Sequence, residues 1–126
     1  MPDRDALTTV LLVEDETLVR MHGAGILEDA GYKVLEAGNA DEALEVLAQH
    51  DEVRLLFSDV DMPGSMDGLA LAALVHERWP DIRLLLTSGH HHLDEAEIPD
   101  SGLFVQKPWT EGVVIDQICR LLDTDR

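Results

Sequence analysis

Polar residues that could carry chemistry stand directly after four of the short apolar runs in this sequence. They are two acidic groups, a pair of hydroxyl residues and a lysine: Glu14 and Asp15, Asp59 and Asp61, Thr87 and Ser88, and Lys107. Crowded carboxylates repel one another, and such a cluster persists when a divalent cation neutralises it. Oxygen ligands from few protein groups suit Mg²⁺, which keeps several waters and binds phosphate oxygens. An ammonium and a hydroxyl could hold the remaining phosphoryl oxygens, so the set suits phosphoryl transfer.

Asp59 is the expected nucleophile of this chemistry. It ends an apolar run and precedes a turn at Pro63 and Gly64, and an aspartate carboxylate can form a covalent aspartyl phosphate. Lys107 and Thr87 would then bind the phosphoryl oxygens. In so acidic a protein any one carboxylate is ordinarily a solvated surface charge, so this interpretation depends on all of these residues ending neighbouring strands.

Five short apolar runs are expected to form the strands that position these residues. The runs cover residues 10–13, 32–35, 53–58, 82–86 and 103–106, and their near-continuous apolar character is typical of a parallel sheet covered on both faces. The carboxyl ends of such a sheet lie at one edge, and ligands bind there where the strand order reverses. Four strands therefore direct polar residues into one crevice. The second run ends in Glu36 alone, which predicts an edge strand.

Segments of helical periodicity alternate with these strands, the pattern of strand, crossover helix and parallel strand. Helices are predicted over residues 17–30, 39–49, 69–78 and 110–122. The second is expected to open with a capping box formed by Asn39 and Glu42. Residues 88–102 leave room for only a short helix, and the last helix is expected to bury Cys119 as a small apolar side chain.

Length and charge limit the classes of protein to which the chain can belong. Its 126 residues suit one domain, predicted to span residues 1–126 with a core at about 7–123 and no output domain. Nine basic and 26 acidic residues give a net charge of −17, which disfavours binding to nucleic acid or to an anionic membrane surface. One cysteine excludes an internal disulfide, and no targeting or membrane-spanning segment is apparent. We therefore expect a cytoplasmic protein.

Four motifs in order along the chain carry a resemblance to a known family. They are Val13-Glu14-Asp15-Glu16, Phe57-Ser58-Asp59-Val60-Asp61-Met62-Pro63, Leu86-Thr87-Ser88-Gly89 and Phe104-Val105-Gln106-Lys107-Pro108-Trp109. Over essentially its full length the sequence resembles the receiver domain of two-component response regulators. The resemblance implies an α/β fold with a doubly wound, five-stranded parallel sheet in the flavodoxin-like order 2-1-3-4-5, in a (βα)5 arrangement.

The resemblance also implies a role for each site residue. Asp59 would accept a phosphoryl group from a histidine kinase or a phosphotransfer protein. Mg²⁺ would be held by Asp15, Asp59 and the backbone carbonyl of Asp61, with Glu14 acting largely through water. Lys107 would contact the phosphoryl group and precede a cis proline.

A switch is implied in the same way. Thr87, beside Ser88, would move inward to hydrogen-bond the phosphoryl group, and Phe104 would rotate behind it. These movements would shift the face formed by the fourth helix of the family, the last strand and the last helix between two populated states. The protein would catalyse only its own phosphorylation and dephosphorylation rather than act as an enzyme on a separate substrate.

Docking residues follow from the same resemblance. In receivers the first helix and the loop after the fifth strand contact the kinase, which makes Leu18, Pro108 and Trp109 candidate contacts. The implied output is that of a stand-alone receiver. It would either contact an unknown downstream protein when phosphorylated or act as a phosphate sink for a kinase.

Some features depart from the usual receiver pattern. The loop after Asp59 is one residue longer than usual, in residues 64–67. Phe104 has no hydroxyl where many receivers have tyrosine, so a switch at this position acts by packing alone. Asp61 and Gly89 occupy positions that tune dephosphorylation in this family.

Two other functions fit parts of the sequence. A haloacid-dehalogenase-like phosphatase also uses a pair of aspartates such as Asp59 and Asp61, but there the nucleophile strand comes first, the reverse of the order here. A receiver-like binding module that is never phosphorylated has only the departures in its favour. His90, His91 and His92 indicate an exposed loop rather than a metal site, because consecutive residues seldom converge on one ion.

Overall fold

Five parallel strands form a sheet at the centre of the protein. The structure, a computed structural model, describes residues 8–90 and 92–123. The strands are β1 (Thr9–Val13), β2 (Lys33–Ala37), β3 (Val53–Asp59), β4 (Arg83–Ser88) and β5 (Leu103–Gln106). Their order is β2-β1-β3-β4-β5, and every neighbouring pair is parallel. This confirms the predicted order and the edge position of β2.

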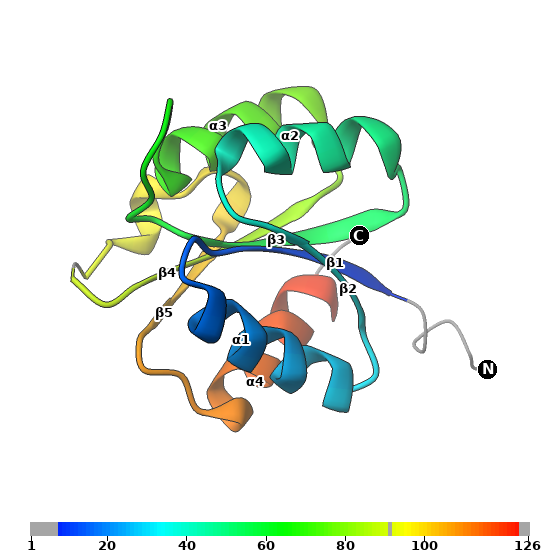
Figure 1. Cartoon of the computed structure of the whole chain (residues 1–126), viewed down its shortest axis with the longest axis vertical. Coiled ribbons are helices and arrows are strands. Elements are labelled where there is room, and N and C mark those ends of the chain that lie inside the picture. Colours follow the sequence, from blue (N-terminus) through cyan, green and yellow to red (C-terminus); the bar gives the residue numbers. More distant parts are fainter. Residues whose placement is uncertain (1–7, 91, 124–126) are drawn as a thin grey trace.

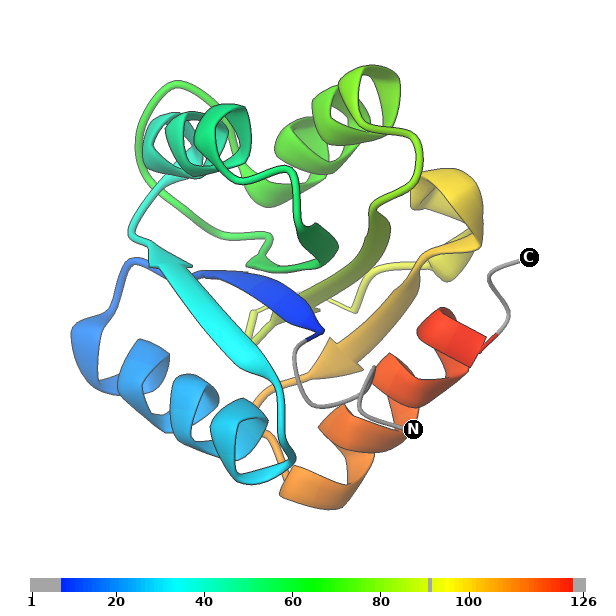
Figure 2. The ribbon, with the colours of Figure 1, turned by 90° about the vertical axis from the view of Figure 1, so that its right-hand side faces the viewer.

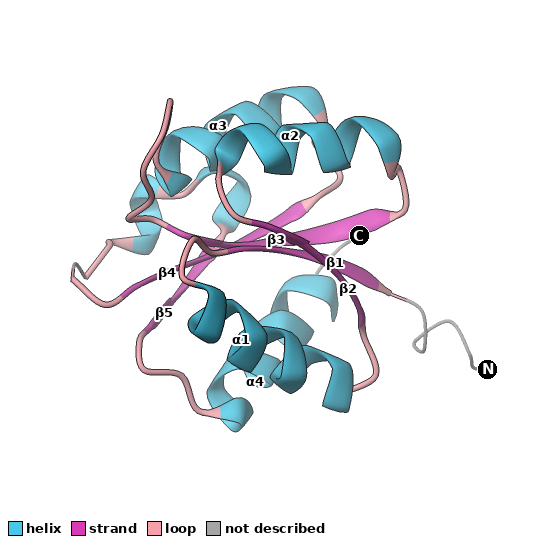
Figure 3. Ribbon diagram, viewed as in Figure 1, coloured by secondary structure: helices cyan, strands magenta, loops and turns pink. Residues whose placement is uncertain are grey.

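Helices cover both faces of the sheet. As Figures 1 and 3 show, α2 (Ala40–Gln49) and α3 (Gly68–Arg78) lie on one face, and α1 (Thr17–Asp29) and α4 (Glu111–Asp123) on the other. Figure 2, turned by 90°, shows the sheet between the two pairs. None of the described helices is long and apolar enough to cross a membrane.

The helix pairs enclose two apolar cores, one on each face of the sheet. Successive strand residues point to opposite faces, so Leu56 of β3 packs in the core with residues of α2 and α3, whereas Phe57 packs in the core with residues of α1 and α4. Both side chains are fully buried. The continuous apolar runs in the sequence therefore reflect burial on both faces of the sheet.

Side-chain caps begin the two helices on the first face. Asn39 accepts a hydrogen bond from the N–H of Glu42 at 2.9 Å, and the Glu42 carboxylate accepts one from the N–H of Gly38 at 2.7 Å. The predicted capping interaction is present, with Glu42 reaching one residue further back than in the standard box. Asp67 caps α3 by accepting a hydrogen bond from the N–H of Ala70.

The segment between β4 and β5 does not form the predicted short α-helix. It contains two 3₁₀ helices, η2 (Glu95–Glu97) and η3 (Pro99–Ser101). Pro99 has no N–H to donate within a helix, and Asp100 and Ser101 have positive φ angles of 61° and 56°, which a right-handed α-helix cannot accommodate. The (βα)5 pattern is therefore incomplete, with four α-helices in the part of the chain that the structure describes.

The prediction that Cys119 is buried is wrong, because this side chain is exposed. The buried stripe of α4 consists of Val114, Ile118 and Leu121, spaced as one face of a helix requires. Cys119 follows Ile118 and is turned by about 100° from that face. Its Sγ lies 3.9 Å from the hydroxyl oxygen of Tyr32.

The junction between β3 and α3 requires a glycine. A Cβ atom at Gly68 would overlap the backbone oxygen of Asp59, so we expect Gly68→Ala to lower the free energy of unfolding by about 2 kcal/mol or more. Gly25→Ala on α1 is the matched control, because a Cβ there meets no atom within 4 Å. It should leave stability unchanged or raise it by up to about 1 kcal/mol. Urea denaturation of both variants measures the difference, and equal stabilities would show that the junction between β3 and α3 tolerates a Cβ atom.

Candidate functional site

The polar clusters predicted from the sequence meet at the carboxyl edge of the sheet. Glu14 and Asp15 follow β1, Asp59 ends β3, Thr87 lies in β4, and Lys107 follows β5. Asp59 and Thr87 are paired in register on adjacent strands. One carboxylate oxygen from each of the three acidic residues lies within 4.8 Å of the others. Among residues 8–90 and 92–123, this is the one set of three ligating side chains close enough to share an ion.

Lys107 lies between two of these carboxylates. Its Nζ is 2.7 Å from Glu14 Oε1 and 3.1 Å from Asp59 Oδ2. Burial opposes the positive charge, but the hydrogen bond to Glu14 and the charge of Asp59 outweigh it and raise the pKa of Lys107 above its usual value. The ammonium is therefore charged at neutral pH and serves as the counter-ion of the cluster.

The carboxylates of the cluster differ in burial. Glu14 is 1% exposed, and burial raises its pKa above the usual value, while hydrogen bonds from Lys107 and from the N–H of Glu16 oppose the increase. Asp59 is also buried, whereas Asp15 is open to water. A cation held by these oxygens could therefore keep some of its waters, as Mg²⁺ usually does.

Ser88 and Asp61 are joined across the edge of the site. The Ser88 hydroxyl donates a hydrogen bond to Asp61 Oδ2 and accepts one from the N–H of His90. The N–H of Asp61 donates to Asp59 Oδ1 at 3.1 Å. Only the backbone carbonyl of Asp61 was predicted to take part in the site, and the contact of its carboxylate with Ser88 was not predicted. No spacing rule could have shown this, because the pairing depends on how two loops meet.

Thr87 is fully buried, and its Oγ1 accepts a hydrogen bond from Trp109 Nε1 at 2.8 Å. The Trp109 ring packs against Phe57, with centroids 5.2 Å apart, and stacks on His22 at 6.0 Å. The bond between Trp109 and Thr87 was not predicted from the sequence. The available signal was general: a buried indole N–H needs an acceptor.

Arg20 supports the site although no role for it was predicted from the sequence. Its guanidinium donates to the backbone oxygen of Glu14 at 2.7 Å and to the Glu36 carboxylate at 3.1 Å. These bonds connect α1 to the ends of β1 and β2, and so hold the loop that carries Glu14. The sequence held no signal for them, since an arginine on an amphipathic helix is usually a surface residue.

The predicted docking residues lie together beside the site. Leu18 is 79% exposed and Pro108 is exposed, whereas Trp109 is largely buried. With His22 and Lys107 among other residues, they line a groove of about 490 Å³. The Lys107–Pro108 peptide bond is cis, as the resemblance implied.

The predicted switch residue Phe104 is buried in the core on the α2 and α3 face. Its ring meets that of His92 edge-on, with centroids 5.5 Å apart. His90 and His92 are exposed, which agrees with the prediction of an exposed histidine loop. His91 lies outside the described residues.

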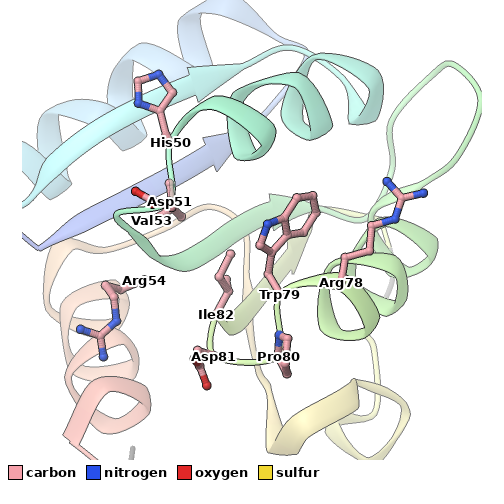
Figure 4. Close-up of a pocket in the computed structure, with 9 residues that line it drawn as sticks. All are labelled: His50, Asp51, Val53, Arg54, Arg78, Trp79, Pro80, Asp81 and Ile82. Carbon is pink, nitrogen blue, oxygen red and sulfur yellow. The ribbon is translucent and has the colours of Figure 1, made fainter.

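A further pocket lies at the opposite, amino edge of the sheet (Figure 4). Its volume is about 500 Å³, and its lining includes Arg54, Arg78, Trp79 and Asp81. None of the predicted site residues lines it. Trp79 is partly buried and packs against the core.

A sequence model of the response regulator receiver domain family matches residues 10–118. The chain belongs to this family. Solved structures agree with the receiver fold. The receiver domain of the hybrid histidine kinase CckA superposes with a TM-score of 0.77 at 30% identity, covering 90% of this chain and 98% of that one. A response regulator receiver protein from Sinorhizobium medicae gives 0.86 at 26% identity, covering 95% and 98%.

The curated relatives that match this chain differ in length, and the match covers different shares of them. The sensor kinase CckA of Brucella abortus is 44% identical over 89 residues, which are 70% of this chain and 9% of that protein. The nitrogen assimilation regulatory protein NtrX of Azorhizobium caulinodans is 32% identical over 93% of this chain and 26% of that protein. The response regulator receiver protein CpdR of Brucella abortus is 30% identical and matches 90% of this chain and 95% of its own length.

The position of Lys107 leads to a stability prediction. Lys107→Met should lower the free energy of unfolding by about 2 kcal/mol in buffer without divalent cations, because two buried carboxylates lose their counter-charge. Lys33→Met is the control, since Lys33 is 52% exposed and 3.9 Å from Glu52, and its loss should change stability by less than about 0.5 kcal/mol. Urea denaturation compares the two variants. A Lys107 variant as stable as the control would show that the cluster does not need this charge.

Proposed function

We propose that this receiver domain accepts a phosphoryl group on Asp59, with Mg²⁺ bound beside it. The observation that carries the proposal is the meeting, at one edge of the sheet, of the Glu14, Asp15 and Asp59 oxygens with the Lys107 ammonium and the buried Thr87 hydroxyl. Membership of the receiver family supports the same assignment. A site of this kind acts by positioning and by electrostatic stabilisation, which is what phosphoryl transfer needs.

The donor set fits Mg²⁺ in number and chemistry. Three carboxylates converge within 4.8 Å, all with the hard oxygen donors that this ion prefers. Asp15 and Asp59 would hold it together with the backbone carbonyl of Asp61, and Glu14 would act through water. When bound, the ion neutralises negative charge on the carboxylates and on the phosphoryl oxygens.

The proposed reaction exchanges one bond to phosphorus for another. An Asp59 carboxylate oxygen forms the new O–P bond, while the P–N bond of a phosphohistidine donor breaks and its electron pair returns to the imidazole nitrogen. Lys107 stabilises the phosphoryl oxygens by charge, and Thr87 donates a hydrogen bond to one of them. Hydrolysis reverses the modification: water attacks phosphorus and releases inorganic phosphate, which leaves Asp59 as a carboxylate.

The phosphoryl donor we propose is a histidine kinase or a phosphotransfer protein. Leu18 and Pro108 are exposed beside the site, on the groove next to Lys107. A donor seated there would bring its histidine to the open side of the crevice. Downstream, we propose either phosphorylation-dependent contacts with another protein or a role as phosphate sink, both as a stand-alone receiver that is not an enzyme on separate substrates. Its cytoplasmic location stays a prediction.

Phosphorylation of Asp59 can be tested directly by intact-mass spectrometry. Incubation with Mg²⁺ and acetyl phosphate should add one phosphoryl group to the wild-type protein and none to Asp59→Asn, which cannot form the acyl phosphate. The adduct should also be lost with EDTA and be strongly reduced in Asp15→Asn. No adduct from acetyl phosphate or from a cognate kinase would favour a receiver-like module that is never phosphorylated.

The docking surface predicts a change in kinetics rather than in chemistry. Leu18→Ala should slow phosphotransfer from the cognate histidine kinase by about ten-fold, as loss of an interface anchor does, and leave phosphorylation by acetyl phosphate unchanged. Val113→Ala on α4 is the matched control, since Val113 is 50% exposed and is not among the residues that line the groove. Equal rates for both variants would place the kinase on another surface.

A further inference from the structure

We propose that Trp109 is a positioning residue for phosphoryl binding, because its indole N–H holds the Thr87 hydroxyl so that the hydroxyl's own hydrogen is presented to a phosphoryl oxygen on Asp59. The inference rests on the proposed function and deepens it. It replaces the inward movement of Thr87 that the family resemblance implied with a hydroxyl that Trp109 already holds in place. It assigns to the indole a part in the chemistry as well as a place in the kinase-facing groove.

The hydrogen bond between Trp109 and Thr87 has a fixed polarity. An indole N–H can only donate, so Thr87 Oγ1 must be the acceptor of the 2.8 Å bond. The hydroxyl hydrogen therefore cannot be directed at the indole. Within residues 8–90 and 92–123, no acceptor for it is found, although Thr87 is 1% exposed. A buried donor without an acceptor destabilises the folded protein unless a bound ligand supplies the acceptor.

An acceptor for the Thr87 hydroxyl hydrogen would lie on the side of Asp59. Asp59 and Thr87 are paired in register on adjacent parallel strands, so their side chains leave the same face of the sheet. Phe57, two residues before Asp59, contacts the Trp109 ring on that face. A phosphoryl group on Asp59 would bring anionic oxygens beside a hydroxyl that Trp109 already holds as a donor.

Contacts with β3 and α1 hold the Trp109 ring in one orientation. The ring packs against Phe57 of β3 and stacks on His22 of α1, with interplanar angles of 49° and 12°. Gly23 lets α1 approach the ring, because a Cβ at this position would lie 2.9 Å from it. An indole held between β3 and α1 has little freedom to turn, so the direction of its N–H is fixed before any ligand arrives.

The test measures the affinity of beryllofluoride, a mimic of the phosphoryl group, by calorimetric titration in saturating Mg²⁺. Trp109→Phe keeps an aromatic ring but removes the N–H, and should weaken binding about two- to ten-fold, the effect of one hydrogen bond. Affinity for Mg²⁺ alone should not change. Trp79→Phe is the matched control, since Trp79 lies at the opposite edge of the sheet (Figure 4), and should bind beryllofluoride as the wild type does.

A double-mutant cycle separates positioning from general packing. Thr87→Val should weaken binding, and Trp109→Phe should then have no further effect in the Thr87→Val protein, because the indole acts through the hydroxyl. Additive losses, or unchanged or tighter binding by Trp109→Phe, would overturn the inference. If the wild type binds no beryllofluoride, or Thr87→Val binds it normally, the proposed function itself fails.

A second measurement needs no substitution at Trp109. The chain has two tryptophans, so Trp79→Phe leaves one indole N–H signal in nitrogen-15 NMR spectra. Its exchange with deuterated water should be slow and should stay slow when Mg²⁺ and beryllofluoride are added, because the bond to Thr87 persists. Fast exchange only after the addition would mean that the hydroxyl leaves the indole to reach the mimic, and would overturn the inference.

Discussion

Concentrated negative charge at one edge of a buried sheet is the constraint on which the rest of this site depends. Glu14 and Asp59 are held out of water, and a buried carboxylate needs a counter-charge or it destabilises the fold. Lys107 provides that charge from 93 residues further along the chain than Glu14. The receiver fold makes this possible because all strands end at the same edge, so residues remote in sequence become neighbours. The arrangement that stabilises these buried carboxylates is also the one that can stabilise a phosphoryl group.

The segment between β4 and β5 shows how the fold tolerates the loss of a helix. Ile98, between the two 3₁₀ helices, is still buried in the core with α2 and α3. The backbone of Phe104 faces the open edge of the sheet, and side chains bond both of its polar groups: Glu95 accepts from its N–H, and Gln117 donates to its oxygen. The edge of β5 is thereby closed to another strand at this residue. Core and edge are both covered without an α-helix here.

Much of the fold was predictable because it rests on local rules. Apolar runs, helix periodicity and the Asn39 cap depend on residues a few positions apart, and these predictions are confirmed. Two predictions were wrong, the burial of Cys119 and the short helix before β5, and in each a second local constraint opposed the pattern used for the prediction. Cys119 fits an apolar pattern but lies one position off the face that α4 buries. The short α-helix predicted before β5 does not form, because Asp100 and Ser101 have left-handed backbone conformations.

The sequence by itself determined the elements and the residue types that gather at the carboxyl edge, because a parallel sheet brings the ends of its strands together whatever the side chains do next. The strand order followed from the family resemblance. Only the tertiary structure decided which of those side chains bind one another. Lys107 bridges Glu14 and Asp59, Ser88 binds Asp61, and Trp109 binds Thr87. Each pair spans separate strands and loops, and hydrogen bonds depend on distances and angles that periodicity and spacing do not encode.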